Sequence, residues 1–121
     1  MKKLKKSTLK KKADKVLSLF IRRYGKCQFK GKDTIHCSSI LQVAHIETRG
    51  TNRLRHDLHN LLCICAGHHW YYTNHPKSFD EMVQKYFPLQ WKYVQLHKKE
   101  IVKRTTEDYQ EIIQMYSKEA V

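Results

Sequence analysis

The sequence predicts an α+β domain, with helices at both ends and a small core between them. This core is expected to contain strands and to be stabilised by a structural zinc ion. Three observations predict this class. Apolar residues recur every three or four positions near both ends, which is the helical period. Two short apolar runs in the middle are typical of strands. All four cysteines and six of the eight histidines lie from Cys27 to His69, where they can supply metal ligands.

The first helix is predicted to follow Ser7, a possible N-cap, and to end near Gly25. Its apolar face is formed by residues at helical spacing, namely Leu9, Ala13, Val16, Leu17, Phe20 and Tyr24. Its other face is rich in lysine. Whether residues 1–12 are ordered stays open at this point.

The central elements follow from composition. Residues 39–46 are rich in β-branched and aliphatic side chains and predict a strand. Residues 47–59 are polar and predict a loop. The apolar run 61–65 then leads into a short helix over 66–72. Residues 25–76 are therefore expected to form the core of a single domain that spans residues 1–121.

Residues 77–121 are predicted to form three helices. Ser78 with Glu81 has the pattern of a capping box, and Thr105 with Asp108 repeats that cap signature. Pro88 can occupy a first turn. The apolar residues of this segment are better explained as packing surface than as a cofactor site.

The charge of the chain is concentrated at its start. Met1–Tyr24 holds ten of the Lys and Arg residues but a single acidic residue, Asp14, in a chain of net charge +13. This excess is larger than solubility requires and predicts a polyanionic partner, with nucleic acid first and an anionic membrane surface second. The candidate nucleic-acid contacts are Lys5, Lys6, Lys10, Lys11, Lys12, Arg22, Arg23, Arg49 and Arg55.

The sequence predicts a soluble, cytoplasmic protein. No run approaches the ~18 to 20 apolar residues needed to span a bilayer. The apolar stretch 16–21 is too short for a signal peptide and is followed at once by Arg22 and Arg23. In a reducing compartment the cysteines are expected to be metal ligands or core thiols rather than disulfides.

Four residues are predicted to form a tetrahedral zinc site: Cys27, Cys37, Cys65 and His68. The second pair has the tight spacing of a zinc knuckle. The first pair is separated by nine residues, where two to four are usual. Cys63 is expected to be a core thiol. We interpret His36, His56 and His59 as surface or phosphate-contacting residues.

Several segments together resemble the HNH endonuclease family over residues 24–95, and most of all its phage members, which include the NinG-like recombination proteins. The matching segments are Leu41-Gln42-Val43-Ala44-His45-Ile46 with Arg49, Arg55-x-Asp57-x-x-Asn60, Leu62–Cys65, His68-His69, and Asn74-His75-Pro76. The combined spacing is far more specific than any single motif.

The resemblance implies a ββα-metal core in which His45 is the general base and His69 ligates a catalytic Mg²⁺ or Mn²⁺. It implies that Asn60 orients the site or contacts this cation, and that Arg49 clamps the phosphate. The chain departs from the family at Ala44, where many members have Asp or His as a ligand. Asp57 is an alternative source of a ligand.

The sequence therefore predicts a metal-dependent DNA endonuclease, stabilised by a structural zinc and working in the host cytoplasm if a phage encodes it. The alternative is a catalytically inactive zinc-containing module that binds nucleic acid, and a weaker third reading is a structural phage assembly partner. Whether the DNA is duplex, branched or single-stranded stays open, as do sequence specificity and oligomeric state.

Overall fold

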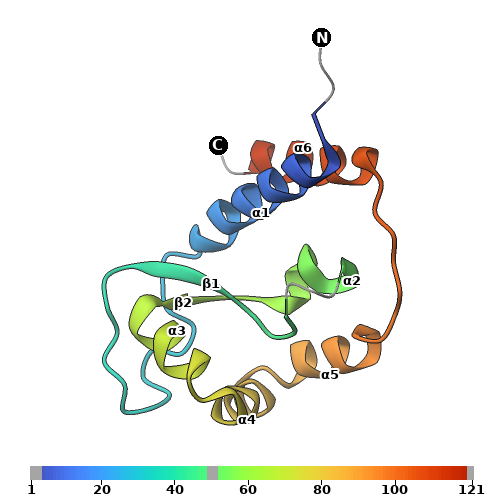
Figure 1. Cartoon of the computed structure of the whole chain (residues 1–121). Helices are drawn as coiled ribbons and strands as arrows, with labels where there is room; N and C mark the ends of the chain where they lie inside the picture. Colours follow the sequence, from blue (N-terminus) through green and yellow to red (C-terminus); the bar gives the residue numbers. More distant parts are fainter. Residues whose placement is uncertain (1–3, 49–51, 120–121) are drawn as a thin grey trace.

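A computed structural model describes residues 4–48 and 52–119 of the chain (Figure 1). Over these residues the fold is α+β, with six α-helices, one 3₁₀ turn and one two-stranded sheet. The elements in chain order are α1 (Lys6–Arg22), β1 (Leu41–His45), α2 (Asn52–Arg55), η1 (Leu58–Asn60), β2 (Leu61–Cys65), α3 (Ala66–Thr73), α4 (Pro76–Tyr86), α5 (Pro88–His97) and α6 (Thr106–Glu119). None of these helices is long and apolar enough to cross a bilayer.

The sheet is covered by helices on both faces. Strands β1 and β2 are antiparallel, with His45 opposite Leu61 and Ala44 opposite Leu62. Because side chains alternate along a strand, Ala44 and His45 point to opposite faces. Ala44 belongs to the main buried cluster with Tyr72 of α3. Helix α1 contacts the sheet as well, on the face to which His45 points.

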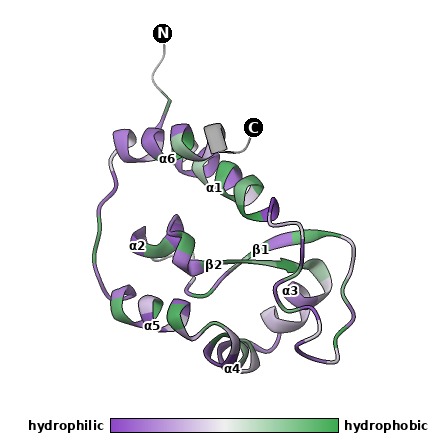
Figure 2. Cartoon of the chain, turned by 180° about the vertical axis from the view of Figure 1, so that it is seen from behind, coloured by the Kyte–Doolittle hydropathy of each residue, from purple (hydrophilic) through white to green (hydrophobic). Residues whose placement is uncertain are grey.

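Helix α1 pairs with α6, although the two lie at opposite ends of the sequence (Figure 1). Leu9 and Ala13 of α1 are buried against Tyr109 of α6. Figure 2 shows hydrophobic and hydrophilic residues alternating along both helices. Residues 6–12 are thus helical. The predicted cap at Ser7 is wrong, because Ser7 lies inside α1, and Tyr24 is 62% exposed beyond its end.

Two other predicted boundaries need correction. The segment 47–59 contains α2 and most of η1, because Leu54 is fully buried and anchors a helical turn. Helix α4 starts at Pro76, whose fixed backbone angle suits a first turn, so Ser78 is not its cap.

Two further predicted cap signals agree with the structure. Pro88 lies in the first turn of α5. Thr105 and Asp108 form the predicted capping box: the Thr105 N–H donates to the Asp108 carboxylate over 2.7 Å, and the Asp108 N–H donates to Thr105 Oγ1 over 3.2 Å.

Candidate metal centre and candidate active site

The four predicted zinc ligands lie together. The Sγ atoms of Cys27, Cys37 and Cys65 and one ring nitrogen of His68 all lie within 4.8 Å of one another, so these residues could hold a metal ion. His68 Nδ1 lies 3.5, 3.6 and 3.1 Å from the three sulfurs in that order. A tetrahedral zinc with bonds of about 2.0 to 2.3 Å requires ligand separations of about 3.5 to 3.8 Å. The donor set and its spacing fit zinc.

Local structure brings these ligands together. The Gln28 N–H donates to the Cys63 carbonyl over 2.7 Å and its side-chain oxygen accepts from the Cys63 N–H over 2.8 Å, which fixes Cys27 beside β2. Cys65 ends β2 and caps α3, where its sulfur accepts from the His68 N–H. A Cβ at Gly67 would lie 3.1 Å from the His36 carbonyl oxygen, so glycine permits the close approach of the segment that ends in Cys37.

The thiols of this cluster differ in acidity. Burial raises the pKa of Cys65, but hydrogen bonds from His68 and from the Ser38 N–H outweigh burial and bring the pKa to about 6. Burial and the neighbouring Cys27 raise the pKa of Cys37 to about 12. Ionisation is thus favoured at Cys65 and disfavoured at Cys37. A divalent cation would favour the thiolate form of every ligand.

Cys63 is fully buried but does not belong to the four-residue cluster, as predicted for a core thiol. Sequence reasoning missed Asp33, whose carboxylate oxygen lies 2.8 Å from His68 Nε2. The one signal that could have indicated it was the unusual length of the segment between Cys27 and Cys37.

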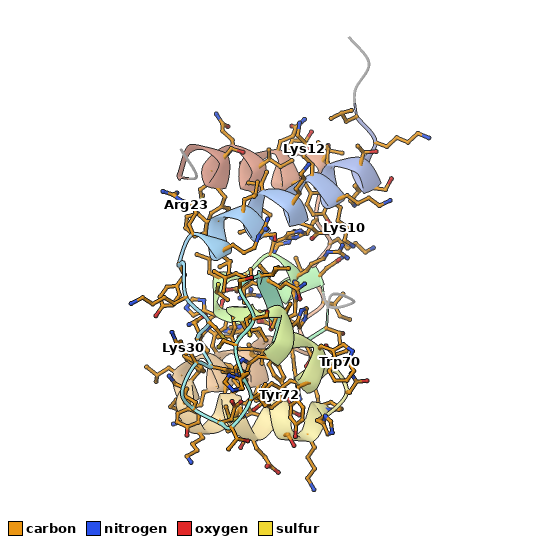
Figure 3. The ribbon with its side chains drawn as sticks, turned by 90° about the vertical axis from the view of Figure 1, so that its left-hand side faces the viewer. Lys10, Lys12, Arg23, Lys30, Trp70 and Tyr72 are labelled. Atoms are coloured by element: carbon orange, nitrogen blue, oxygen red, sulfur yellow. The ribbon has the colours of Figure 1, made fainter. Side chains whose placement is uncertain are left out.

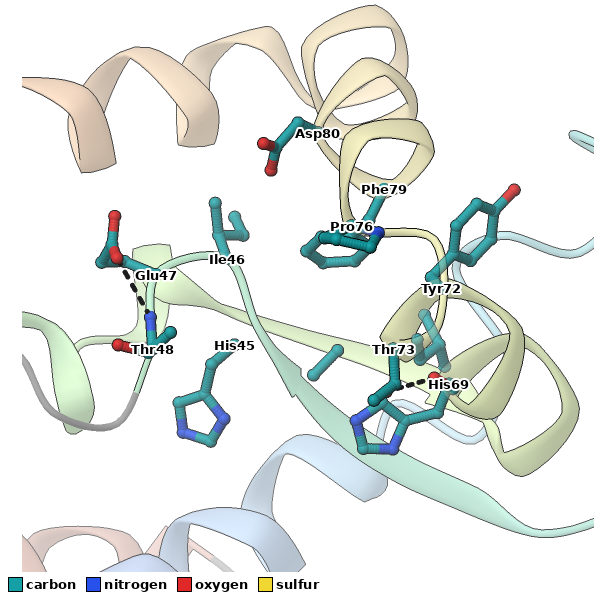
Figure 4. Close-up of a pocket in the computed structure, with 12 residues that line it drawn as sticks. His45, Ile46, Glu47, Thr48, His69, Tyr72, Thr73, Pro76, Phe79 and Asp80 are labelled. Carbon is teal, nitrogen blue, oxygen red and sulfur yellow. Dashed lines mark hydrogen bonds between the residues drawn. The ribbon is translucent and has the colours of Figure 1, made fainter.

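The two catalytic histidines of the prediction line one cavity. His45, at the end of β1, and His69, on α3, both border an open cavity of about 380 Å³ (Figure 4). In Figure 4, Pro76, Phe79 and Asp80 are drawn above the imidazole rings of His45 and His69. The structure thus brings His45 and His69 to one site from two different elements.

His69 has a defined ring orientation. Its Nδ1 lies 2.6 Å from Oε1 of Gln42, a residue of β1 that sequence reasoning did not single out. Because an amide oxygen only accepts, Nδ1 carries the proton and Nε2 is the nitrogen with a lone pair. Gln42 is two residues before Ala44, so strand alternation could have placed it on this face.

Asn60 is buried behind the turn that follows His45. Its side-chain oxygen accepts from the Glu47 N–H over 2.7 Å, and its Nδ2 donates to the carbonyls of Glu47 and Leu54. The Ile46 N–H donates to the Asn60 carbonyl. These bonds hold the turn that follows His45, and both polar atoms of the Asn60 side chain are engaged by backbone.

The possible cation ligands around the cavity are few. Ala44 is buried and offers no donor atom. Asp57, the alternative, is bound by Arg53, Tyr93 and His59 instead. The described lining includes two acids that were not predicted, Glu47 and Asp80. Burial and the charge of Glu47 raise the pKa of Asp80.

Most predicted basic contacts are exposed along α1 and at its ends (Figure 3). The exposed ones are Lys5, Lys6, Lys11, Lys12, Arg22 and Arg23. Lys10 is part-buried and donates to Asn52 over 2.9 Å. Arg55 is paired with Asp14, so it serves an internal contact. Arg49 lies outside the described residues.

The predicted surface histidines differ. His36 and His59 are exposed, as expected. The prediction for His56 is wrong: its side chain is 1% exposed, and Nε2 lies 2.8 Å from the Asp14 carboxylate. Asp14 therefore joins α1 to the segment around α2. Burial opposes its ionisation, but hydrogen bonds from Arg55 and His56 hold the pKa of Asp14 far below its usual range.

No protein-family model, curated protein or solved structure matches this chain.

Proposed function

We propose that this protein is a metal-dependent endonuclease that hydrolyses phosphodiester bonds in DNA and is stabilised by a structural zinc. The observation that carries the proposal is the cavity shared by His45 and His69. A general base and a cation ligand must reach the same phosphate, so they have to border one accessible space.

His45 is proposed as the general base. Hydrolysis needs a water that loses its proton as it attacks phosphorus, and an imidazole with an unperturbed pKa of ~6.5 can accept that proton near neutral pH. Asn60 supports this role, since its hydrogen bonds to Glu47 fix the turn directly after His45. A base on an unrestrained loop would be less well positioned.

His69 is proposed as the cation ligand, through Nε2. Its hydrogen bond to Gln42 supports this assignment, because it leaves the lone pair on the other nitrogen. A bound Mg²⁺ or Mn²⁺ would supply positive charge where the reacting phosphate becomes more negative. Arg49 is proposed to add a second, bidentate contact to that phosphate.

DNA is the proposed substrate because His45, besides bordering the cavity, also borders a small second pocket lined by residues of the strongly basic helix α1. His45 lies near Leu17 and Ser18 of α1, and the exposed lysines of the same helix can contact phosphates on either side of the cut. Such contacts favour binding without sequence preference.

One observation favours the second candidate, an inactive zinc-containing module that binds nucleic acid. Among the described residues, the single group of three or more His, Cys, Asp or Glu side chains arranged to hold a metal is the Cys and His cluster. With alanine at position 44, the cavity holds a cation less firmly, so activity would need ligands from the substrate and water.

A plasmid-nicking assay separates the two candidates. With 10-fold steps of Mg²⁺ or Mn²⁺, the wild-type protein should convert supercoiled DNA to nicked or linear forms. His45→Ala should lower the cleavage rate by about 10² to 10⁴ and leave zinc content and DNA affinity unchanged. His69→Ala should also cut slowly, but raised Mn²⁺ should partly restore it.

His59→Ala is the matched control, because His59 is exposed and is absent from the cavity lining. It should cut like the wild type. If the wild-type protein binds DNA and zinc but cuts no DNA with either cation, the binding module is the correct function. Equal rates for His45→Ala and wild type would exclude His45 as the base.

A further inference from the structure

The segment between Cys27 and Cys37 is longer than a zinc knuckle needs. Nine residues separate the two thiols, whereas two to four are usual. The segment is ordered by its own turns: the Lys30 N–H donates to the Cys27 carbonyl and the Lys32 N–H to the Phe29 carbonyl, both over 3.1 Å. Phe29 is fully buried among the aromatic side chains of the core. The extra length therefore has a fixed course.

This course brings Asp33 against helix α3. Its Oδ1 lies 2.8 Å from His68 Nε2 and accepts from the Ile35 N–H over 3.0 Å. Its Oδ2 accepts from the Tyr72 hydroxyl over 2.5 Å. The side chain is 14% exposed. Three donors thus converge on one carboxylate, which as an anion offers acceptors only.

We infer that Asp33 is a positioning residue of the metal centre, and that the long segment between Cys27 and Cys37 serves to deliver it to His68. The inference depends on the zinc site of the proposed function. A neutral imidazole carries one ring proton. When Nε2 donates that proton to Asp33, the lone pair is on Nδ1, the atom that faces the three sulfurs. Outer carboxylates fix metal-binding histidines in this way.

Tyr72 strengthens the arrangement. It lies four residues after His68, one turn along α3, and donates to the other oxygen of the same carboxylate. Asp33 therefore contacts two successive turns of α3. This double contact fixes the direction of the carboxylate and, through it, the plane of the His68 ring.

The test measures zinc affinity by competition with a chromogenic chelator. Asp33→Ala should weaken zinc binding by about 10- to 100-fold, the usual effect of removing an outer partner. Asp33→Asn keeps an oxygen for His68 but loses the charge, so a smaller loss is expected. Tyr72→Phe should have the smallest effect. Thr34→Ala is the matched control, because Thr34 is an exposed neighbour in the same segment, and it should bind zinc like the wild type.

A spectroscopic readout separates positioning from general destabilisation. In the zinc-loaded wild type, ¹⁵N NMR of the His68 ring should show a slowly exchanging proton on Nε2. Asp33→Ala should lose this protection, and the Co²⁺-substituted protein should show a shifted ligand-field spectrum.

If Asp33→Ala fails to fold at saturating zinc, Asp33→Asn and Tyr72→Phe decide: wild-type zinc affinity and ring signals in both would overturn the inference. A wild-type protein that binds no zinc would instead overturn the zinc site on which the inference rests. A zinc-binding wild type with unaffected Asp33 variants would overturn the role of Asp33 alone.

Discussion

The metal centre and the cavity use neighbouring histidines in opposite ways. His68 is completely buried, with three sulfurs around one ring nitrogen and a carboxylate at the other. His69, the next residue of α3, borders an open cavity and has a neutral amide at Nδ1. The chain can supply all four ligands of a zinc ion at the first site. A cation in the cavity would depend on substrate and solvent for its remaining ligands.

The two sites should therefore respond to metal in different ways. Binding at a closed four-ligand site is coupled to folding, because the site does not exist in the unfolded chain. Binding at a site with one or two protein ligands is weak and leaves the fold unchanged. Zinc removal should therefore unfold the protein, and Mg²⁺ removal should not.

Replacing either of two cysteines of β2 should give very different losses of zinc and of unfolding free energy. Cys65→Ser removes a ligand and should cost several kcal/mol, since structural zinc contributes about 10 to 16 kcal/mol in zinc-finger peptides. Cys63→Ser places a hydroxyl in an apolar site and should cost about 1 to 3 kcal/mol. Zinc content and urea unfolding measure both. Similar loss of zinc from the two variants would contradict the four-residue site.

Helix α1 is attached to the segment around α2 through Asp14, and this attachment does not involve the zinc ligands. Asp14→Asn leaves Arg55 and His56 without their anion and should lower the free energy of unfolding by about 1 to 3 kcal/mol. This is below the cost for fully buried pairs, because the side chains of Asp14 and Arg55 are 13% and 17% exposed and can be hydrated. Zinc content should be unchanged.

The pH dependence of this difference has a definite sign. The pKa of Asp14 is lower in the folded state than its unfolded value of about 3.9. The stabilisation is therefore complete above about pH 4 and is lost as pH falls further. Urea unfolding from pH 8 to pH 5 should show that the gap between wild type and Asp14→Asn is retained. A gap that shrinks as pH falls through this range would contradict the ion pair, because Asp14 stays ionised there.

A smaller effect is expected from supplying the ligand that the cavity lacks. Ala44 is paired with Leu62 and shares the strand face of Gln42, which contacts His69. Ala44→Asp should lower stability without cation, because position 44 is 3% exposed. We expect it to raise Mn²⁺ affinity about tenfold, equivalent to about 1.4 kcal/mol.

Thermal unfolding with increasing Mn²⁺ measures this gain without any cleavage. Ala44→Asn is the control, since the asparagine side chain has nearly the same shape as that of aspartate but carries no charge. Identical Mn²⁺ responses of Ala44→Asp and Ala44→Asn would place the cation away from position 44.

The sequence predicted the two sites unequally, for physical reasons. Ligand spacing and strand alternation depend on local geometry, so Cys65 with His68, and both strands, could be located from the chain. Asp33 and Asp14 act across 35 and 42 positions through long-range contacts. Nothing in their local sequence indicates those partners. For the same reason His56 was assigned to the surface.

Single lysines on the exposed face of α1 should each make a small contribution to DNA binding. Deleting residues 1–12 would remove Leu9 from the contact with Tyr109 and disturb the fold, so single charges should be removed instead. Lys11→Gln and Lys12→Gln keep good helix formers at exposed positions. If each lysine neutralises one phosphate, each change should reduce the slope of log K against log salt by about 0.9 for duplex DNA.

Fluorescence anisotropy with two unrelated duplexes, from 50 to 200 mM salt, measures that slope. The loss should be equal for both duplexes, because phosphate contacts carry no sequence information. Lys99→Gln is the matched control, since Lys99 is exposed after α5, far along the chain from α1, and should leave the slope unchanged. If Lys11→Gln and Lys12→Gln both keep the wild-type slope, α1 does not lie along the DNA backbone. DNA would then have to approach His45 from another side.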